Sequence, residues 1–200
     1  MRIIGFAGRM GSGKDTAYQL LSGYSVREKD CIAVFRRLAF AEPLKEAARN
    51  AFGGESRNYW GSIDNKNEII YPWNVSGRQI MQFLGTEMFR DTVRNLCPEV
   101  GDNFWIMRLQ QEIDKSDPDI INCITDVRFQ NEADWIVENN GIVIRIIREG
   151  QPFNVGLPEH VSEKDFIPPK ERYYEVRNDG TPLEMLAQLL TVITQHFHLK

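Results

Sequence analysis

The chain has 200 residues, of which 42% are hydrophobic, and its formal net charge is −4 with a pI near 5.5. This length and hydrophobic content predict one well-packed domain. An acidic balance argues against a nucleic-acid partner, whose binding surfaces are typically basic. No apolar run approaches the roughly 18 residues of a membrane span, so we expect no membrane partner and a cytoplasmic location.

Three cysteines are spread widely along the chain, at Cys31, Cys97 and Cys123. Their number is odd, and no Cys-x-x-Cys or histidine spacing accompanies them, so neither a disulfide framework nor a zinc site is indicated. We expect reduced thiols. The sequence leaves open whether the chain forms a homodimer.

The amino-terminal segment is the most informative part of the chain. Residues 2–7 read as a buried strand, and a glycine-rich turn and a helix over residues 14–22 follow. The spacing Gly8-x-x-x-x-Gly13-Lys14 is that of a P-loop, in which backbone N–H groups surround phosphate oxygens and the lysine reaches the β- and γ-phosphates. The predicted nucleotide-binding residues are Gly8, Gly11, Ser12, Gly13, Lys14, Asp15 and Thr16.

The residue after the P-loop lysine is unusual. Asp15 stands where Ser or Thr is common, and Thr16 follows one position later. A carboxylate at this position is able to hold Mg²⁺ or to cap the helix, and the sequence leaves both roles open.

In the middle of the chain some segments have a clear helix or strand pattern and others do not. We expect a strand over residues 33–40 and a helix over residues 42–52, whereas residues 53–75 have no clean period and form a loop or a small inserted subdomain. Ser76 is expected to cap a helix that reaches about residue 93, and another helix is expected over residues 102–113. Helical spacing places Arg78 and Gln82 on one face, where phosphate and base contacts are possible.

The second half begins with the apolar run of residues 119–125, which is typical of a central parallel strand. Asp126 closes this run, and Arg128 lies two residues further on. Asp126 is a candidate for orienting Mg²⁺ or for acting as a base, and Arg128 is a candidate phosphate ligand. The alternative is an Asp-Arg pair that merely caps the next helix.

The remaining elements continue the alternation. We expect a helix over residues 131–138, a strand over residues 142–147, a proline-rich loop over residues 149–170, a strand over residues 173–176 and a last helix. In that helix the spacing of apolar residues predicts one buried stripe, formed by Leu183, Leu186, Leu190, Ile193 and Phe197.

Strands that alternate with helices predict an α/β fold with a parallel sheet covered by helices on both faces. Ligands of such sheets bind outside the carboxyl ends of the strands, so we expect the P-loop and Asp126 at one edge. The predicted architecture is a single domain over residues 1–200.

Five segments together resemble the bacteriophage-type deoxynucleoside monophosphate kinases, a group within the P-loop nucleoside monophosphate kinases. They are GRMGSGKDT (8–16), FAEPLK (40–45), GRQIMQFLGTE (77–87), DVRFQNEA (126–133) and NDGT (178–181). The resemblance extends from residue 3 to about residue 190. Aspartate after the P-loop lysine is common in this family.

The resemblance implies a three-layer α/β/α P-loop fold with an acceptor-binding insertion at about residues 53–100 and a lid at about residues 149–170. It implies transfer of the γ-phosphoryl group of ATP to a deoxynucleoside monophosphate, and hence small-molecule substrates, with Mg²⁺ as cofactor. The implied catalytic residues are Lys14, Arg128 and Asp126, the metal ligands Asp15 and Asp126, and the adenine contact Asn178. The implied acceptor-binding residues are Arg78, Gln82, Lys45, Arg128 and Arg148.

Two alternatives stay open at this point. One is another small-molecule P-loop kinase, such as a dephospho-coenzyme A kinase, and the other is a nucleotide-dependent switch without transfer activity. A switch does not need arginines poised opposite the P-loop, whereas a kinase does. If the chain is phage-encoded, the location becomes the host cytoplasm.

Overall fold

A computed structural model describes residues 1–24, 26–28, 31–149 and 171–197, except for the side chains of 26–28, 31–33 and 101. The chain forms two compact units, one made of Met1–Ala39 with Glu112–Lys200 and the other of Phe40–Gln111. Residues 150–170, on which most of the expected lid falls, lie outside the described residues. No helix in the described part is long and apolar enough to cross a membrane.

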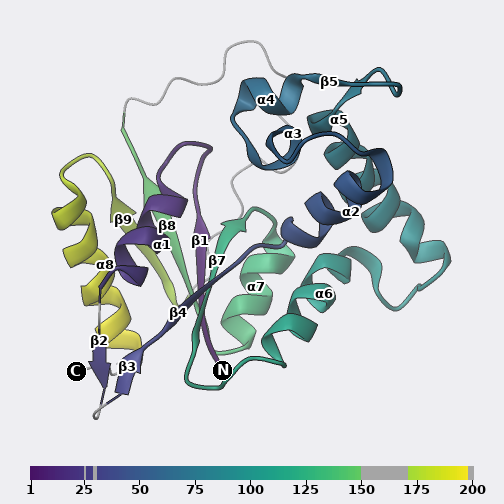
Figure 1. The fold of residues 1–200 in the computed structure, drawn as a ribbon. Helices are drawn as coiled ribbons and strands as arrows, with labels where there is room; N and C mark the ends of the chain where they lie inside the picture. Colours follow the sequence, from purple (N-terminus) through teal and green to yellow (C-terminus); the bar gives the residue numbers. More distant parts are fainter. Residues whose placement is uncertain (25, 29–30, 150–170, 198–200) are drawn as a thin grey trace. The chain divides into compact units, whose positions relative to one another are not determined.

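The first unit is built on a five-stranded sheet (Figure 1). Its strands, in spatial order, are β4 (Phe35–Leu38), β7 (Ile121–Val127), β1 (Arg2–Ala7), β8 (Ile142–Ile147) and β9 (Tyr173–Arg177). Each neighbouring pair is parallel, as predicted. The carboxyl ends of these strands therefore share one edge. A separate hairpin pairs β2 (Val26–Glu28) with β3 (Cys31–Ala33).

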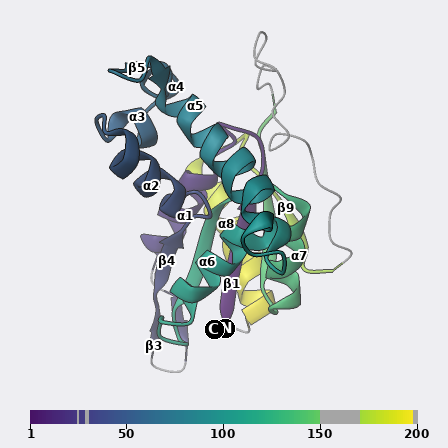
Figure 2. The same ribbon diagram turned by 90° about the vertical axis from the view of Figure 1, so that its right-hand side faces the viewer.

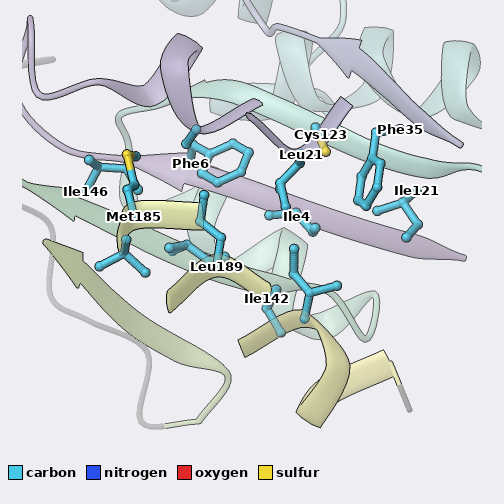
Figure 3. Close-up of a cluster of buried hydrophobic side chains, with 14 residues drawn as sticks. Ile4, Phe6, Leu21, Phe35, Ile121, Cys123, Ile142, Ile146, Met185 and Leu189 are labelled. Carbon is cyan, nitrogen blue, oxygen red and sulfur yellow. The ribbon is translucent and has the colours of Figure 1, made fainter. Parts of the chain in front are cut away.

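Helices cover both faces of this sheet (Figures 1 and 2). The helices α1 (Lys14–Ser22) and α8 (Pro182–Phe197) pack together on one face, and α7 (Gln130–Glu138) covers the other. Successive side chains of β1 point to opposite faces of the sheet, which explains the two helical layers. Ile4 and Phe6 lie in the cluster with α1 and α8 (Figure 3). Gly5, between them, faces α7, since a Cβ at Gly5 would lie 2.4 Å from Cδ1 of Ile136 in that helix. The three-layer prediction is confirmed.

The buried side of α8 differs from the predicted stripe. Met185, Leu189 and Ile193 are fully buried against the sheet, whereas Leu183 is 74% exposed. Leu186, Leu190 and Phe197 pack only partly against the core. The prediction is therefore confirmed for Ile193 and wrong for Leu183, and the centre of the buried face is rotated toward Met185 and Leu189. The reason is that α8 has more apolar residues than one face needs, and the sheet determines which face is buried.

The bounds of several elements shift by a few residues. The strand expected over residues 33–40 is limited to β4, and β7 continues through Asp126 to Val127, so that Asp126 lies inside the strand rather than after it. The helix expected from residue 102 begins with a 3₁₀ turn over Gly101–Asn103 and continues as α6 (Phe104–Ile113).

The Phe40–Gln111 unit is mostly helical. It contains α2 (Glu42–Phe52), α3 (Arg57–Trp60), α4 (Ile63–Asn67), the two-residue strands β5 (Ile69–Ile70) and β6 (Val75–Ser76), and α5 (Gly77–Gln82). Ser76 caps α5 as predicted, because its hydroxyl accepts from the N–H of Gln79. The helix then changes its hydrogen-bonding pattern: Phe83–Thr92 form a π-helix, and Val93–Asn95 form a 3₁₀ turn.

Candidate active site

The glycines of the P-loop have backbone conformations that strongly favour glycine. Gly8, Gly11 and Gly13 have φ values of 132°, 78° and 106°. A Cβ at Gly8 would lie 2.5 Å from the carbonyl oxygen of Ile146, and one at Gly13 would lie 2.3 Å from Nδ2 of Asn178. The loop therefore packs against the ends of neighbouring strands with no room for side chains at these two positions.

Lys14 opens α1 and turns back toward the loop. Its Nζ donates to the carbonyl oxygens of Gly8, at 2.7 Å, and Arg9, at 2.9 Å. Burial, and next the positive charge of Arg128, lower the pKa of the Lys14 ammonium from its ordinary 10.5 to about 8, against the opposing charges of Asp15 and Asp126. The charges of the predicted residues Asp15, Asp126 and Arg128 therefore all act on the ammonium of Lys14.

The sheet explains why Arg128 is near the P-loop. In the register of the central strands Ala7 pairs with Val127, so the residues after β1 and β7 leave the sheet side by side. Arg128 is exposed there. Within the part of the chain that the structure describes, its guanidinium makes no hydrogen bond or ion pair. A cationic group without a protein partner next to Lys14 is suited to an anionic ligand.

Asn178 joins the P-loop from the far side. It follows β9, and its Nδ2 donates to the carbonyl oxygen of Ser12 at 2.8 Å, while its own N–H donates to Ile147 at 2.7 Å. The sequence predicted Asn178 as a nucleotide contact and gave no sign of this bond between distant residues. In the structure its side chain holds the loop itself.

Comparison with known proteins identifies the family of this chain. The model of the family described as deoxynucleotide monophosphate kinase matches residues 59–189, well over half of the chain. The chain belongs to the deoxynucleotide monophosphate kinase family. The recognition made from the five sequence segments is therefore confirmed.

Two viral relatives of this kinase extend over nearly its whole length. A protein of Acanthamoeba polyphaga mimivirus, named as a deoxynucleotide monophosphate kinase, is 29% identical over 197 residues and 96% of each chain is covered. The deoxynucleoside-5′-monophosphate kinase of Escherichia phage T5 is 26% identical over 234 residues, with 88% of this chain and 89% of the relative covered. Family membership makes the chain a phosphotransferase that acts on small molecules, and a kinase of this family implies ATP as the phosphate donor.

Two carboxylates of the kinase are suited to a divalent cation. Asp126 is half-buried at the end of β7, and Asp15 is exposed in the first turn of α1. No group of three acidic, histidine or cysteine side chains that would form a protein-only metal site exists among the described residues. Mg²⁺ is usually held by one or two carboxylates together with substrate phosphates and waters, so this donor set fits the ion.

Asp15 has a partner that the sequence did not predict. Arg37, next to the last residue of β4, donates to Oδ1 of Asp15 from NH2 at 3.0 Å and from Nε at 3.3 Å. The side chains are 40% and 68% exposed, so the pair adds little to stability. It orients Asp15 at the opening of α1.

The predicted acceptor residues Arg78, Gln82 and Lys45 lie in the Phe40–Gln111 unit of the kinase. Arg78 and Gln82 occupy positions one turn apart in α5, and both are partly buried. Lys45 forms an ion pair with Glu42 at 3.4 Å, and Glu42 also accepts from Nε1 of Trp60 at 2.7 Å. Arg148 is exposed directly after β8.

Aromatic side chains of the same unit can either stack on a base or pack within the protein, and their contacts distinguish the two roles. Tyr59 is fully buried, and its hydroxyl donates to the carbonyl oxygen of Gly53 at 2.8 Å. Trp73 donates to Phe52 at 2.8 Å and packs its ring edge-on against Phe52. For Tyr59 and Trp73 these contacts are those of packing residues.

A carboxylate of the helix itself accepts hydrogen bonds at the start of the helix that follows Arg128. It belongs to Glu132, which accepts from the backbone N–H groups of Arg128 and Phe129. Glu132 lies in the segment DVRFQNEA (126–133), but the sequence alone assigned it no role. An available signal was its position, since acidic residues in the first helical turn often accept from preceding N–H groups.

Proposed function

We propose that the chain transfers the γ-phosphoryl group of ATP to a deoxynucleoside monophosphate at the carboxyl edge of its sheet. Lys14 holds the donor and Arg128 holds the phosphate of the acceptor. The observation that supports this most is the pairing of two cations: Arg128 is close enough to Lys14 to lower its pKa, and its guanidinium has no partner among the described residues.

Electrostatics explains why such a pair is useful. Both substrates are polyanions, and two unit charges 4 Å apart repel by about 4 kcal/mol at an effective dielectric constant near 20. Two adjacent cations repel as well, which raises the free energy of the empty site. Phosphates that bind between the two cations offset the repulsion between the cations, and the cations in turn reduce the repulsion between the phosphates. This kind of catalysis consists of positioning and charge stabilisation, and it requires no covalent nucleophile.

The donor side is formed by the P-loop and the amino terminus of α1. Backbone N–H groups of the loop and the helix dipole favour the phosphates of ATP. The ammonium of Lys14 donates to the carbonyl oxygens of Gly8 and Arg9, and binding of ATP would exchange these bonds for bonds to phosphate oxygens. Asn178 keeps the loop in shape through Ser12.

Asp15 and Asp126 are the residues that would hold Mg²⁺. The ion, when bound, neutralises charge on the phosphates of ATP. Both carboxylates face the ammonium of Lys14, whose pKa their charges raise. They therefore also keep this lysine protonated, a role that they perform without the ion. Asp126 is the candidate base for the acceptor phosphate, though phosphoryl transfer places little demand on a base.

On the acceptor side we assign the phosphate to Arg128 and Arg78, with Lys45 and Arg148 as further cations. We assign the base to Gln82, whose amide both donates and accepts hydrogen bonds. Arg78 resembles Arg128 in one respect: among the described residues its guanidinium has no hydrogen bond or ion pair.

Substitution of the two cations tests this assignment. Lys14→Ala is expected to abolish turnover while the melting temperature stays near that of the native chain. Arg128→Ala is expected to lower kcat/KM for the monophosphate by about 100-fold, as for loss of a charged phosphate contact, and to change the Kd of ATP by less than about threefold.

The control is Lys115→Ala, which removes an exposed cation whose one ion pair among the described residues is with Glu112, at 3.6 Å. A coupled assay of ADP release over the four common deoxynucleoside monophosphates, their ribose forms and dephospho-coenzyme A measures both constants. Undiminished turnover of Lys14→Ala, or equal loss of ATP and acceptor binding in Arg128→Ala, contradicts the proposal. Turnover of dephospho-coenzyme A alone would favour the other kinase.

A further inference from the structure

Glu132 is a buried carboxylate at the start of α7. It is only 2% exposed. Its Oε2 accepts from the backbone N–H of Arg128 at 2.8 Å and from that of Phe129 at 3.1 Å. A carboxylate is costly to bury unless it is hydrogen-bonded, and here the bonds are made to the two residues that connect β7 with α7.

Those two residues form the whole connection, because β7 ends at Val127 and α7 begins at Gln130. Phe129 occupies the N-cap position and offers no side-chain oxygen. Glu132 therefore fixes the peptide units of Arg128 and Phe129 from within the first turn of the helix. Since Val127 is buried in the sheet, the backbone of Arg128 is held on both sides.

The charge of Arg128 explains why its backbone needs to be held by Glu132. Arg128 and Lys14 are both cations and repel each other, and the charge of Arg128 is the second cause, after burial, of the lowered pKa of Lys14. A flexible connection would let Arg128 move away from Lys14 whenever no anionic ligand lies between them. The bonds from Glu132 oppose that movement at the backbone, where they leave the guanidinium unobstructed.

We propose that Glu132 is a positioning residue, which holds Arg128 in place for the acceptor phosphate through its two backbone hydrogen bonds. The proposal rests on the proposed function, and specifically on Arg128 as the acceptor ligand. Positioning of Arg128 affects the binding and turnover of the acceptor, whereas capping of α7 alone would affect only stability.

A double-mutant cycle tests the proposal on the full chain. Glu132→Ala is expected to lower kcat/KM for a deoxynucleoside monophosphate by about 10- to 100-fold and to leave the Kd of ATP within about twofold. Glu132→Gln keeps a side-chain oxygen that can accept, and a smaller loss of about threefold is expected. In the Arg128→Ala background, Glu132→Ala is expected to cause no further loss, because it acts through Arg128.

Two controls separate positioning from folding. Ile136→Val reduces the fully buried core of the same helix, and Glu138→Gln removes an exposed charge from its end. Ile136→Val is expected to lower the melting temperature without changing kcat/KM for the monophosphate. If Glu132→Ala fails to fold, Glu132→Gln carries the comparison.

The kinetic constants and melting temperatures decide the question. A loss that is confined to the monophosphate and absent from the Arg128→Ala background supports the proposal. A fall in melting temperature with unchanged kinetic constants, or losses that simply add in the double variant, overturns it. If Arg128→Ala itself has no effect on the monophosphate, the assigned role of Arg128 fails, and this inference fails with it.

Discussion

At the scale of single residues, the site depends on charges that burial and neighbours tune. The pKa of Lys14 is lowered to about 8, mainly by burial and then by Arg128. Phosphates bind the protonated ammonium better than the neutral amine, so binding of ATP raises this pKa again. Proton uptake is therefore coupled to ATP binding wherever the free lysine is neutral.

This coupling predicts a pH dependence. The Kd of ATP is expected to be nearly constant below pH 8 and to rise by up to about tenfold per pH unit above it. Lys14→Arg keeps its charge throughout, so it binds ATP with no such bend. Calorimetry between pH 7 and pH 10, in buffers of different ionisation enthalpy, measures Kd and proton uptake together. A bend shared by Lys14→Arg would assign the titration to another group.

The same shift has an opposite effect on the free protein. Since the folded-state pKa is below the ordinary 10.5, the unfolded chain binds more protons at Lys14 between about pH 8 and pH 10.5. Stability from this group therefore increases as the pH rises through that range.

Asn178 gives a second prediction at this scale. Its amide donates to Ser12 in the P-loop, so Asn178→Ala is expected to weaken ATP binding by about 3- to 10-fold, the usual worth of one such bond. Tripolyphosphate, which has no base, is expected to lose affinity equally. A loss seen with ATP alone would show that Asn178 contacts adenine instead.

The matched control for that measurement is Asn139→Ala. Nδ2 of Asn139 donates to the carbonyl oxygen of Trp135 at 2.9 Å, the same kind of bond but located at the carboxyl end of α7 and outside the P-loop. Its removal is expected to leave both affinities unchanged.

At the scale of elements, sequence reasoning succeeded where a local signal defines both ends. The predicted bounds 2–7, 14–22, 42–52 and 142–147 are those of β1, α1, α2 and β8. Glycines or prolines mark these boundaries, and apolar runs fill the strands between them. The π-helix over Phe83–Thr92 has no such signal. Its side chains suit an α-helix equally, and contacts such as Trp105 Nε1 to the carbonyl oxygen of Gly85, at 3.2 Å, form only in the folded unit.

The rotation of α8 predicts unequal costs for two leucines of one helix. Leu189 is fully buried and Leu183 is 74% exposed. Leu189→Ala is expected to lower the free energy of unfolding by about 2–5 kcal/mol, and Leu183→Ala by no more than about 0.5 kcal/mol. Urea denaturation measures both values. Equal losses in the free energy of unfolding would contradict the rotation and indicate that Leu183 is buried, as the sequence predicted.

At the scale of the whole molecule, the chemical groups of the site could be predicted from the sequence more fully than the bonds that hold them in place. Lys14 and Arg128 were predicted because the P-loop spacing and the end of a buried strand are local patterns. The bonds that hold them were not: Asn178 and Ser12 are 166 positions apart, and only the sheet order β1–β8–β9 brings them together. Arg37 meets Asp15 for a similar reason, through β4.

The proposed donor and acceptor residues predict separate responses to the two substrates. In hydrogen exchange of the intact chain, ATP is expected to slow exchange at the P-loop and the first turn of α1, where it accepts from N–H groups. A deoxynucleoside monophosphate is expected to slow exchange in α5 and the following π-helix. Lys14→Ala should remove the first response and keep the second, and Arg78→Ala should do the reverse. A monophosphate that protects only the P-loop would place the acceptor residues outside the Phe40–Gln111 unit.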